Sequence, residues 1–271
     1  MGKITLRIFL LSLALLAVTQ WSAQAATFRF KSTVEPRRWT TTLSGTLVTP
    51  KGKGPFPVVI FLHPCSDLPG LVRKSLNTHA QYLARHGFAT LIPNSFDPRN
   101  LSGGKACGGP LANTGTNLLI DDAFNAKAAL AKSPKFDADN IFIAGQSLGA
   151  TAALRASTKS YSRHDGAFRA AVAWYPRCFD IVTGADLKSP LLVLGGSADD
   201  WTPPGNCERP KKHNRMSGAD YEVIVYKGAL HGFDQPRGRY RYHGHWLGYD
   251  AAATAAGRKA MLAFFQAHLK K

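Results

Sequence analysis

Short apolar segments alternate with polar loops and helical stretches along most of the chain. The segment at 56–63, FPVVIFLH, is apolar throughout, which is typical of a strand that helices bury on both faces. Strands that alternate with helices require crossover connections, and these favour parallel pairing. We therefore predict an α/β fold with a mostly parallel central sheet and helices on both faces. Further strands are expected at 88–92, 141–144, 170–174, 191–194 and 221–226, and helices near 74–85, 117–131, 148–158 and 251–269.

Two other segments have different patterns. Residues 26–50 alternate and are rich in Thr, Val and Phe, which predicts an antiparallel strand pair. Residues 95–117 are rich in glycine, and we expect a long loop at the carboxyl edge of the sheet, where such folds bind ligands. No repeat, low-complexity tract or linker divides the chain, so 26–271 is expected to form a single domain.

The first 25 residues have the layout of a secretory signal peptide. Lys3 and Arg7 precede an apolar run at 8–18, and Ala23-Gln24-Ala25 supplies the small residues of a cleavage site before Ala26. That run has about 11 residues, whereas a membrane-spanning helix needs about 20. An uncleaved anchor is therefore the weaker interpretation. We expect a periplasmic or secreted protein with no stable membrane insertion after cleavage.

The chain is strongly basic, with 34 Lys and Arg against 17 Asp and Glu and a net charge of +17. In an exported protein this balance favours envelope polyanions or acidic substrates as neighbours, and a basic surface that serves solubility is the alternative. The basic residues are spread along the chain, apart from a cluster at 237–246. No nucleic-acid module is therefore predicted.

Four cysteines remain after export, and an oxidising compartment predicts two disulfides. Three pairings are possible. Cys178–Cys207 is favoured because both residues are expected in loops that leave neighbouring strands, and Cys65–Cys107 is then the second pair. Their spacing does not match a zinc site, and no metal or cofactor is expected.

The clearest chemical motif is GQSLG at 145–149, which lies between a predicted strand and a predicted helix. In G-x-S-x-G the serine occupies a sharp strand-to-helix turn, and its small neighbours are required because other parts of the chain pass close by. Ser147 is therefore the predicted nucleophile. The first N–H groups of the following helix favour negative charge at this point.

A serine nucleophile needs a base and a carboxylate that orients the base. His231 follows the predicted strand 221–226 and is the expected base, although a histidine in a loop is more often an ordinary polar residue. Asp199 and Asp200 follow the strand 191–194. Asp199 is favoured because GSADDWTP resembles the G-x-x-D-x-x-T/V-P turn, in which the acid stands four residues before the proline, and Asp200 is then a solvated neighbour or a helix cap.

Acyl transfer also needs two N–H donors for the oxyanion of the tetrahedral intermediate. The backbone N–H of Leu148, which follows the nucleophile, is the first candidate. The second is expected in the loop after strand 56–63, where Pro64 has no N–H and Cys65 is therefore predicted. A nucleophilic role for Cys65 is less favoured because no base is placed for it. His63 is expected to brace this loop, with substrate contact as the alternative.

Six segments together resemble the dienelactone hydrolase family of α/β hydrolases, and specifically its exported serine-dependent members. The resemblance covers almost all of the mature chain and implies an α/β-hydrolase fold and hydrolysis without a cofactor. The best-studied members have a cysteine where this chain has Ser147, and they often have His-Gly where it has His63-Pro64. The matching segments are FLHPCSD, NSFDPR, AGQSLGA, AWYPRC, GSADDWTPPGNC and GALHGFD.

Other residues near the predicted site have open roles. Trp174, Tyr175 and Trp201 either wall an acyl pocket or pack in the interior. His243 and His245 offer too few ligands for a metal. The three arginines of the basic cluster, Arg237, Arg239 and Arg241, follow the expected base closely and are predicted to attract an anionic substrate.

These observations predict a serine hydrolase that cleaves a small-molecule carboxylic ester or lactone through an acyl-enzyme. Ser147, Asp199 and His231 would perform the reaction, with Leu148 and Cys65 N–H groups at the oxyanion. A peptidase or an acyltransferase that uses the same residues is an alternative, since selectivity resides in loops. A non-catalytic envelope-binding protein with the same fold is a weaker one.

Overall fold

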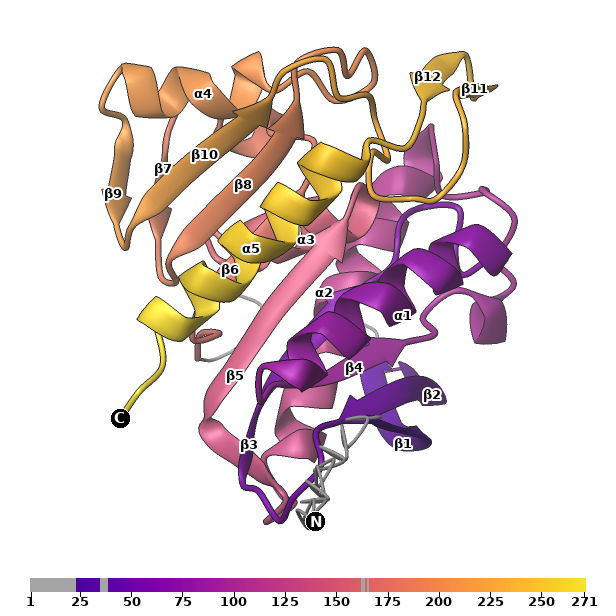
Figure 1. Ribbon diagram of the computed structural model, residues 1–271, viewed down its shortest axis with the longest axis vertical. Helices are drawn as coiled ribbons and strands as arrows, with labels where there is room; N and C mark the ends of the chain where they lie inside the picture. Colours follow the sequence, from indigo (N-terminus) through magenta and orange to yellow (C-terminus); the bar gives the residue numbers. More distant parts are fainter. Residues whose placement is uncertain (1–22, 35–38, 162–163, 165) are drawn as a thin grey trace, which may run out of the picture.

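One eight-stranded sheet forms the centre of the computed structural model, which describes residues 23–34, 39–161, 164 and 166–271 (Figure 1). The strand order is β1-β2-β4-β3-β5-β6-β8-β10. Strands β4, β3, β5, β6, β8 and β10 are parallel to one another, and β1 and β2 form an antiparallel pair at one edge. The predicted α/β fold is confirmed. The strands are β1 (Gln24–Val34), β2 (Trp39–Thr49), β3 (Phe56–Leu62), β4 (Ala89–Pro93), β5 (Phe136–Gln146), β6 (Ala171–Trp174), β8 (Leu191–Gly196) and β10 (Tyr221–Tyr226).

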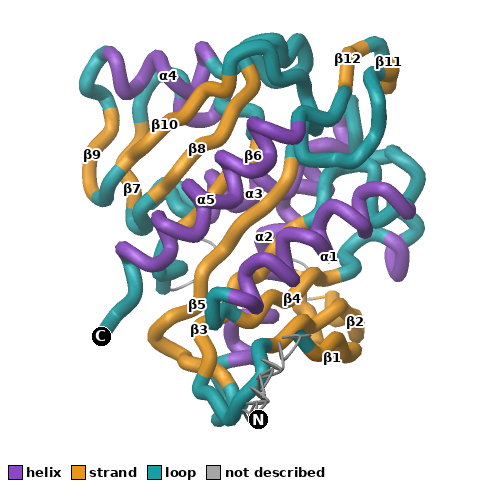
Figure 2. The backbone as a smooth tube through the Cα atoms, viewed as in Figure 1, coloured by secondary structure: helices purple, strands orange, loops and turns teal. Residues whose placement is uncertain are grey.

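Helices cover both faces of the sheet (Figures 1 and 2). Helices α1 (Gly70–Arg85) and α5 (Ala251–Ala267) pack on one face, and α2 (Pro110–Leu130) and α3 (Leu148–Ala156) on the other. In β3, Val58 and Ile60 join the core under α2 and α3, whereas Val59 and Phe61 join the core under α1 and α5. Since successive side chains of a strand point to opposite faces, burial on both faces explains the unbroken apolar run.

The predicted loop at 95–117 is shorter than expected. A short 3₁₀ helix, η1, occupies Asp97–Arg99, and α2 already begins at Pro110. The sequence hides this start because proline and small residues suggest a loop, yet proline is tolerated in the first helical turn, where its missing N–H would have no partner. The remaining loop lies beyond the carboxyl end of β4, as predicted, and Gly103 reaches the main cavity at that edge.

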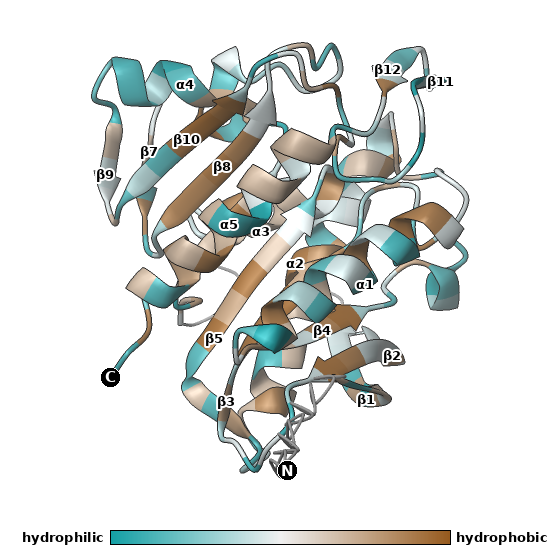
Figure 3. Cartoon of the chain, in the orientation of Figure 1, coloured by the Kyte–Doolittle hydropathy of each residue, from teal (hydrophilic) through white to brown (hydrophobic). Residues whose placement is uncertain are grey.

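Besides the short 3₁₀ helices, one α-helix and four short strands of the described residues were not predicted from the sequence. Helix α4 (Gly205–Lys212) contains Pro210 and is strongly hydrophilic (Figure 3). Its 8 residues form only about two turns, which is too short for a helical pattern of apolar residues to be recognised. Two small strand pairs, β7 (Ala185–Leu187) with β9 (Met216–Gly218) and β11 (Tyr240–Tyr242) with β12 (His245–Leu247), have three residues per strand. Strands this short carry almost no alternation to detect.

Both predicted disulfides are present. Cys65–Cys107 joins the loop after β3 to the segment that precedes α2, with an S–S distance of 2.06 Å. Cys178–Cys207 joins the segment after β6 to α4, with an S–S distance of 2.04 Å. Each bond therefore fixes a loop at the same edge of the sheet.

The predicted signal peptide falls almost entirely outside the described residues. Of its last three residues, Gln24 and Ala25 lie in β1 and pair with Thr49 and Val48 of β2. Within the described part of the chain, none of the helices combines the length and the hydrophobicity needed to cross a bilayer.

Candidate active site

Ser147 lies at the turn between β5 and α3, where the backbone is strained. Its φ of 51° and ψ of −111° are unusual for a residue other than glycine, and the conformation is the one expected of a nucleophile elbow. A Cβ added to Gly149 would come within 2.6 Å of the backbone oxygens of Leu62 and His63, and one added to Gly145 would collide with the backbone of Gly149. The two glycines therefore allow β5, α3 and the end of β3 to meet closely enough to form this turn.

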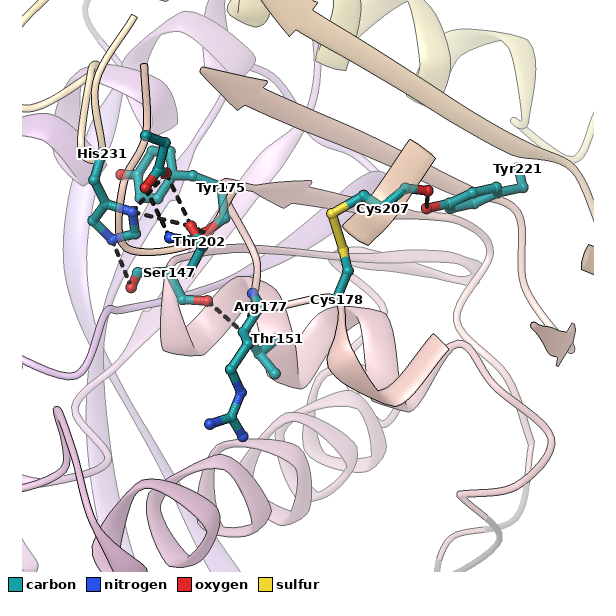
Figure 4. Close-up of a disulfide and its surroundings, with 10 residues drawn as sticks. Ser147, Thr151, Tyr175, Arg177, Cys178, Thr202, Cys207, Tyr221 and His231 are labelled. Atoms are coloured by element: carbon teal, nitrogen blue, oxygen red, sulfur yellow. Dashed lines mark hydrogen bonds and ion pairs between the residues drawn. A yellow bond between two sulfur atoms is a disulfide. The ribbon is translucent and has the colours of Figure 1, made fainter. Parts of the chain in front are cut away.

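The structure brings Ser147, His231 and Asp199 into one hydrogen-bonded series, in which the contact between Ser147 and His231 is drawn in Figure 4. The Ser147 Oγ lies 3.0 Å from His231 Nε2, and His231 Nδ1 lies 2.8 Å from an Asp199 carboxylate oxygen. All three side chains are buried, although they come from loops after β5, β8 and β10. An Nδ1–H that donates to Asp199 leaves Nε2 free to accept the serine proton.

The Asp199 carboxylate is held on both of its oxygens. The backbone N–H groups of Trp201 and Thr202 donate to Oδ1 at 2.9 and 2.8 Å, while the Thr202 hydroxyl donates to Oδ2 at 2.9 Å. Burial by itself would raise the pKa of this carboxyl. The charge and hydrogen bond of His231, together with the Thr202 bonds, outweigh burial and hold the Asp199 pKa below its ordinary value.

Asp200 occupies a different place. Its carboxylate is exposed, accepts from the Trp246 N–H at 3.2 Å and lies 3.5 Å from His245 Nδ1. It therefore has no contact with His231 comparable to that of Asp199, and it behaves as the solvated neighbour that the sequence suggested.

Thr202 is a part of the site that the sequence did not identify, and Tyr175 was left open there between the acyl pocket and the interior. The Thr202 hydroxyl lies 3.1 Å from His231 Nδ1 as well as beside Asp199, and the Tyr175 ring packs edge-on against the His231 ring at 4.8 Å. For Thr202 the sequence signal was the Thr of GSADDWTP, which stands three residues after Asp199. Tyr175 is fully buried and, unlike Trp201, lines neither cavity that reaches Ser147.

The backbone of His231 is held by a short strand that the sequence did not predict. His231 forms a parallel bridge with Leu247 of β12, and its carbonyl accepts from the Gly248 N–H at 3.3 Å. The β11/β12 hairpin therefore fixes the backbone position from which the His231 side chain extends. Ring contacts from Trp201 at 4.9 Å and Tyr175 then limit how it can turn.

Ser147 and His231 open into a cavity of about 460 Å³. Ser66, Gln235 and Arg237 supply polar side chains, and no carboxylate lines it among the described residues. Most of the wall is apolar or aromatic, as in sites that bind small organic molecules. These apolar and aromatic side chains are Pro64, Pro69, Leu71, Val72, Trp201, Tyr240, Tyr242 and Leu247.

The two predicted oxyanion donors lie next to Ser147. Leu148 is the first residue of α3, so its N–H has no acceptor within the helix. Cys65 is held in place by its disulfide, and Cys65 and Leu148 both line a second, smaller cavity that also reaches Ser147. A carbonyl oxygen bound here would lie at the positive end of the α3 dipole.

His63 braces the loop after β3. Its Nδ1 donates to the Pro64 carbonyl at 2.8 Å, and its Nε2 accepts from the Ser95 N–H at 3.3 Å. The ring is fully buried, and this burial lowers the His63 pKa. It lines neither cavity at Ser147, so the bracing role predicted for it is the one that its contacts fit.

The basic cluster is arranged around aromatic rings. Arg237 lies over the Tyr240 ring at 4.0 Å and lines the main cavity, whereas Arg239 and Arg241 lie over Trp246 at 4.2 and 5.1 Å. His245 stacks on Trp201 at 4.9 Å. In the described part of the chain, no three metal-binding side chains lie together.

The parallel sheet, the elbow at Ser147 and the loops after β8 and β10 define an α/β hydrolase. The sequence profile of the dienelactone hydrolase family matches residues 43–269. The chain therefore belongs to the dienelactone hydrolase family, whose members hydrolyse ester or lactone bonds.

Relatives and solved structures agree with this membership. A Methylorubrum extorquens protein provisionally named carboxymethylenebutenolidase is 27% identical over 68% of this chain and 65% of its own length, so the match spans less than two thirds of that relative. An Escherichia coli K12 protein with the same provisional name is 27% identical over 79% of this chain and 78% of its own.

Two solved structures show the same fold. A dienelactone hydrolase-like promiscuous phosphotriesterase from metagenomic libraries is 20% identical, with a TM-score of 0.65 over 91% of this chain and 99% of the other. An esterase from Thermogutta terrifontis is 16% identical, with a TM-score of 0.57 over 84% and 90%.

Proposed function

We propose that this protein is a serine hydrolase that cleaves carboxylic esters or lactones of small molecules through an acyl-enzyme. The observation that carries the proposal is the continuous contact from Asp199 through His231 to Ser147, which ends in an apolar cavity. A serine hydroxyl becomes an effective nucleophile only when such a base can take its proton during attack.

In the first half of the reaction, His231 Nε2 removes the proton of Ser147 as Oγ bonds to the substrate carbonyl carbon. The protonated ring is stabilised by Asp199, and it returns the proton to the alcohol oxygen as that bond breaks. Water then attacks the acyl-enzyme, with His231 again as the base, and the acid leaves. The proposed reaction requires no cofactor.

The oxyanion of each tetrahedral intermediate would accept from the N–H groups of Leu148 and Cys65. One such donor is worth about 3 kcal/mol of transition-state stabilisation. The two disulfides provide a matched test of the Cys65 role. Replacing both Cys65 and Cys107 by serine should lower kcat by about 10-fold or more, whereas the same change at Cys178 and Cys207 should lower stability and leave kcat within about 3-fold.

The substrate class extends to anionic esters. Arg237 is the cation that lines the cavity, and the whole chain carries a net charge of +17. Charge reversal at Arg237 should lower kcat/KM for an anionic ester more than for a neutral one of equal size. Equal losses of kcat/KM for the two esters would show that Arg237 does not attract anionic substrates.

We also propose that the protein is exported and acts in the periplasm or outside the cell, as a single domain at 26–271 after removal of 1–25. The two disulfides support this, because such bonds persist in oxidising compartments. The N-terminus of protein recovered from the periplasm or the medium, read by mass spectrometry, tests it: a mature chain that still begins at Met1 would contradict cleavage before Ala26.

The decisive test of function is covalent labelling. A fluorophosphonate probe should modify Ser147 in the folded protein, and the Ser147→Ala variant should neither label nor hydrolyse p-nitrophenyl esters or lactones. Folded wild-type protein that takes up no probe and cleaves no ester would support the binding-protein alternative. Far-UV circular dichroism on both proteins provides the control for folding.

A further inference from the structure

Ser147 borders two cavities of very different size. The main cavity has about 460 Å³, and a second has about 60 Å³. Cys65 and Trp201 line both, so these residues stand between the two spaces with Ser147 at the junction. An ester also has two arms that meet at its carbonyl carbon. Each cavity can therefore receive one arm when that carbon is in contact with Ser147.

The surrounding residues decide which arm enters which cavity. His231 lines the large cavity and is absent from the lining of the small one, whereas Leu148 lines only the small one. Because His231 must return a proton to the departing alcohol oxygen, the alcohol arm has to lie on the His231 side. The acyl arm then points into the small cavity, beside the Leu148 and Cys65 N–H groups.

The small cavity admits only a short chain. A cavity of about 150 Å³ holds the six carbons of benzene, so about 60 Å³ leaves space for two or three carbon atoms, with the carbonyl carbon included. Its walls are also poorly able to move, since Ala112 belongs to α2, Thr151 belongs to α3, and Cys107 is joined covalently to Cys65. Thr151 is fixed further by donating to the Ser147 carbonyl at 3.2 Å.

Arg177 forms the adjustable part of the small cavity. Its backbone N–H donates to the Thr151 hydroxyl at 2.9 Å, and its side chain extends away from Ser147 and His231 (Figure 4). The guanidinium lies 3.4 Å from the Asn113 amide oxygen, at the exposed surface. Removing this side chain would lengthen the cavity without altering the contacts of Ser147, Asp199 or His231.

We infer that the enzyme is selective for short acyl groups, of two or three carbons, carried on a large alcohol with apolar or aromatic parts. The inference rests on the proposed function, and it names the substrate class of the same site. The large cavity suits such an alcohol because Trp201, Tyr240, Tyr242 and Leu71 offer flat and apolar surfaces.

Two series of substrates test the inference on the wild-type protein. In the first, p-nitrophenyl acetate, propionate, butyrate and hexanoate vary the acyl arm, and kcat/KM should fall by at least about 100-fold from acetate to hexanoate, because overfilling a pocket by each methylene costs about 10-fold or more. In the second, phenyl and 2-naphthyl acetate vary the alcohol arm, and kcat/KM should not fall with size.

Three variants locate the selectivity. Arg177→Ala should lower the acetate-to-butyrate ratio of kcat/KM by about 10-fold, and Ala112→Val should raise it by a similar factor because the added methyl groups fill the small cavity. Leu71→Ala is the matched control in the large cavity: it should change the preference among alcohols and leave the acetate-to-butyrate ratio within about 2-fold. If Ala112→Val fails to fold, the acetate-to-butyrate ratio of Arg177→Ala still tests the inference.

The possible failures are distinguishable. Hydrolysis that depends on Ser147 but is equally fast for hexanoate and acetate, or an Arg177→Ala ratio equal to that of wild type, would overturn the selectivity and leave the proposed function intact. No Ser147-dependent hydrolysis of any ester in either series would overturn the proposed function and this inference with it.

Discussion

Among the described residues, two buried histidines form a hydrogen bond with a buried aspartate, and only one of these pairs adjoins a nucleophile. His231 Nδ1 lies 2.8 Å from Asp199, and His79 Nε2 lies 2.7 Å from Asp234. All four side chains are buried. The pairs differ at the second nitrogen of each ring. His231 meets the Ser147 hydroxyl at 3.0 Å, whereas His79 Nδ1 accepts from Arg258 Nε at 3.2 Å.

That second partner determines what each ring can do. Arginine does not give up a proton in proteins, so the His79 Nδ1 has no group with which to exchange one. Burial also lowers the His79 pKa, against the opposing effect of Asp234, and the ring stays neutral with its proton on Nε2. The comparison teaches that an Asp–His pair provides acid–base chemistry only where its free nitrogen faces a reacting atom.

The Asp234 carboxylate has a structural task in place of a chemical one. Besides His79, it accepts from Tyr175 Oη and Gln146 Nε2, both at 2.5 Å. Gln146 precedes Ser147, and Tyr175 packs on His231, so Asp234 supports the site from beneath. Burial would raise its pKa, but the bonds from His79, Tyr175 and Gln146 prevail and lower it.

The largest difference between the pairs should appear in histidine substitutions. His231→Ala removes the proposed base, and kcat for p-nitrophenyl acetate should fall by about 10⁶-fold, as expected when one member of a cooperating set is lost. His79→Ala should keep kcat within about 10-fold in the fraction that folds. Active-site titration with the fluorophosphonate probe gives that fraction, and equal losses in the two variants would refute the distinction.

A smaller effect is expected from Asp199→Asn. The amide would hold His231 in the wrong tautomer, with the proton on Nε2, so kcat should fall by about 10⁴-fold. Asp200→Asn is the matched control, because Asp200 is exposed and its carboxylate lies beside Trp246 and His245 and away from His231. Steady-state kinetics on both variants check this. A larger loss of kcat in Asp200→Asn would show that Asp200, and not Asp199, orients His231.

Asp234→Asn should act mainly on stability. Asparagine offers one acceptor oxygen where the three donors His79, Tyr175 and Gln146 converge, so we expect the free energy of unfolding to fall by about 3 kcal/mol. Urea denaturation followed by tryptophan fluorescence measures this. A stable variant that loses activity as fully as Asp199→Asn would show that Asp234 belongs to the chemistry after all.

The pH dependence of stability gives the finest test. The folded protein holds His79 neutral with a pKa below 6.5, so below pH 6.5 the unfolded chain binds a proton that the folded chain does not. Stability should therefore decrease on acidification, by up to about 1.4 kcal/mol per pH unit, until the folded pKa is reached. His63, which burial also keeps neutral, adds to this slope.

A variant isolates the contribution of His79. In His79→Gln the slope between pH 6.5 and 5 should become shallower by about one proton, as measured by urea denaturation at several pH values. Asp234 and Asp199 affect stability at lower pH. Their depressed pKa values stabilise the fold above pH 3.8, and this stabilisation is lost as the pH falls further. An unchanged slope in His79→Gln would contradict the neutral ring.

The sequence predicted the features that arise from local pattern. Buried parallel strands read as apolar runs, the elbow at Ser147 reads as G-x-S-x-G, and His231 and Asp199 follow their strands directly. Ser147, His231 and Asp199 could be chosen because the fold gathers the carboxyl ends of its strands at one edge.

Other features depend on contacts between distant segments. Asp234 meets His79 across 155 residues, and nothing near either residue signals the pairing. Tyr175 was undecided between packing and the pocket, because strand ends supply both environments. The strand β12 has three residues, yet its bridge to His231 fixes the base. Such contacts follow from the completed sheet, so a one-dimensional pattern does not contain them.

The proposed activity depends on the Cys65–Cys107 bond, which forms only when the two thiols are oxidised. A newly made chain in a reducing cytoplasm lacks this bond, so the loop after β3 and the segment before α2 are held only by noncovalent packing. We expect such a chain to bind probe and cleave esters poorly until the two thiols are oxidised.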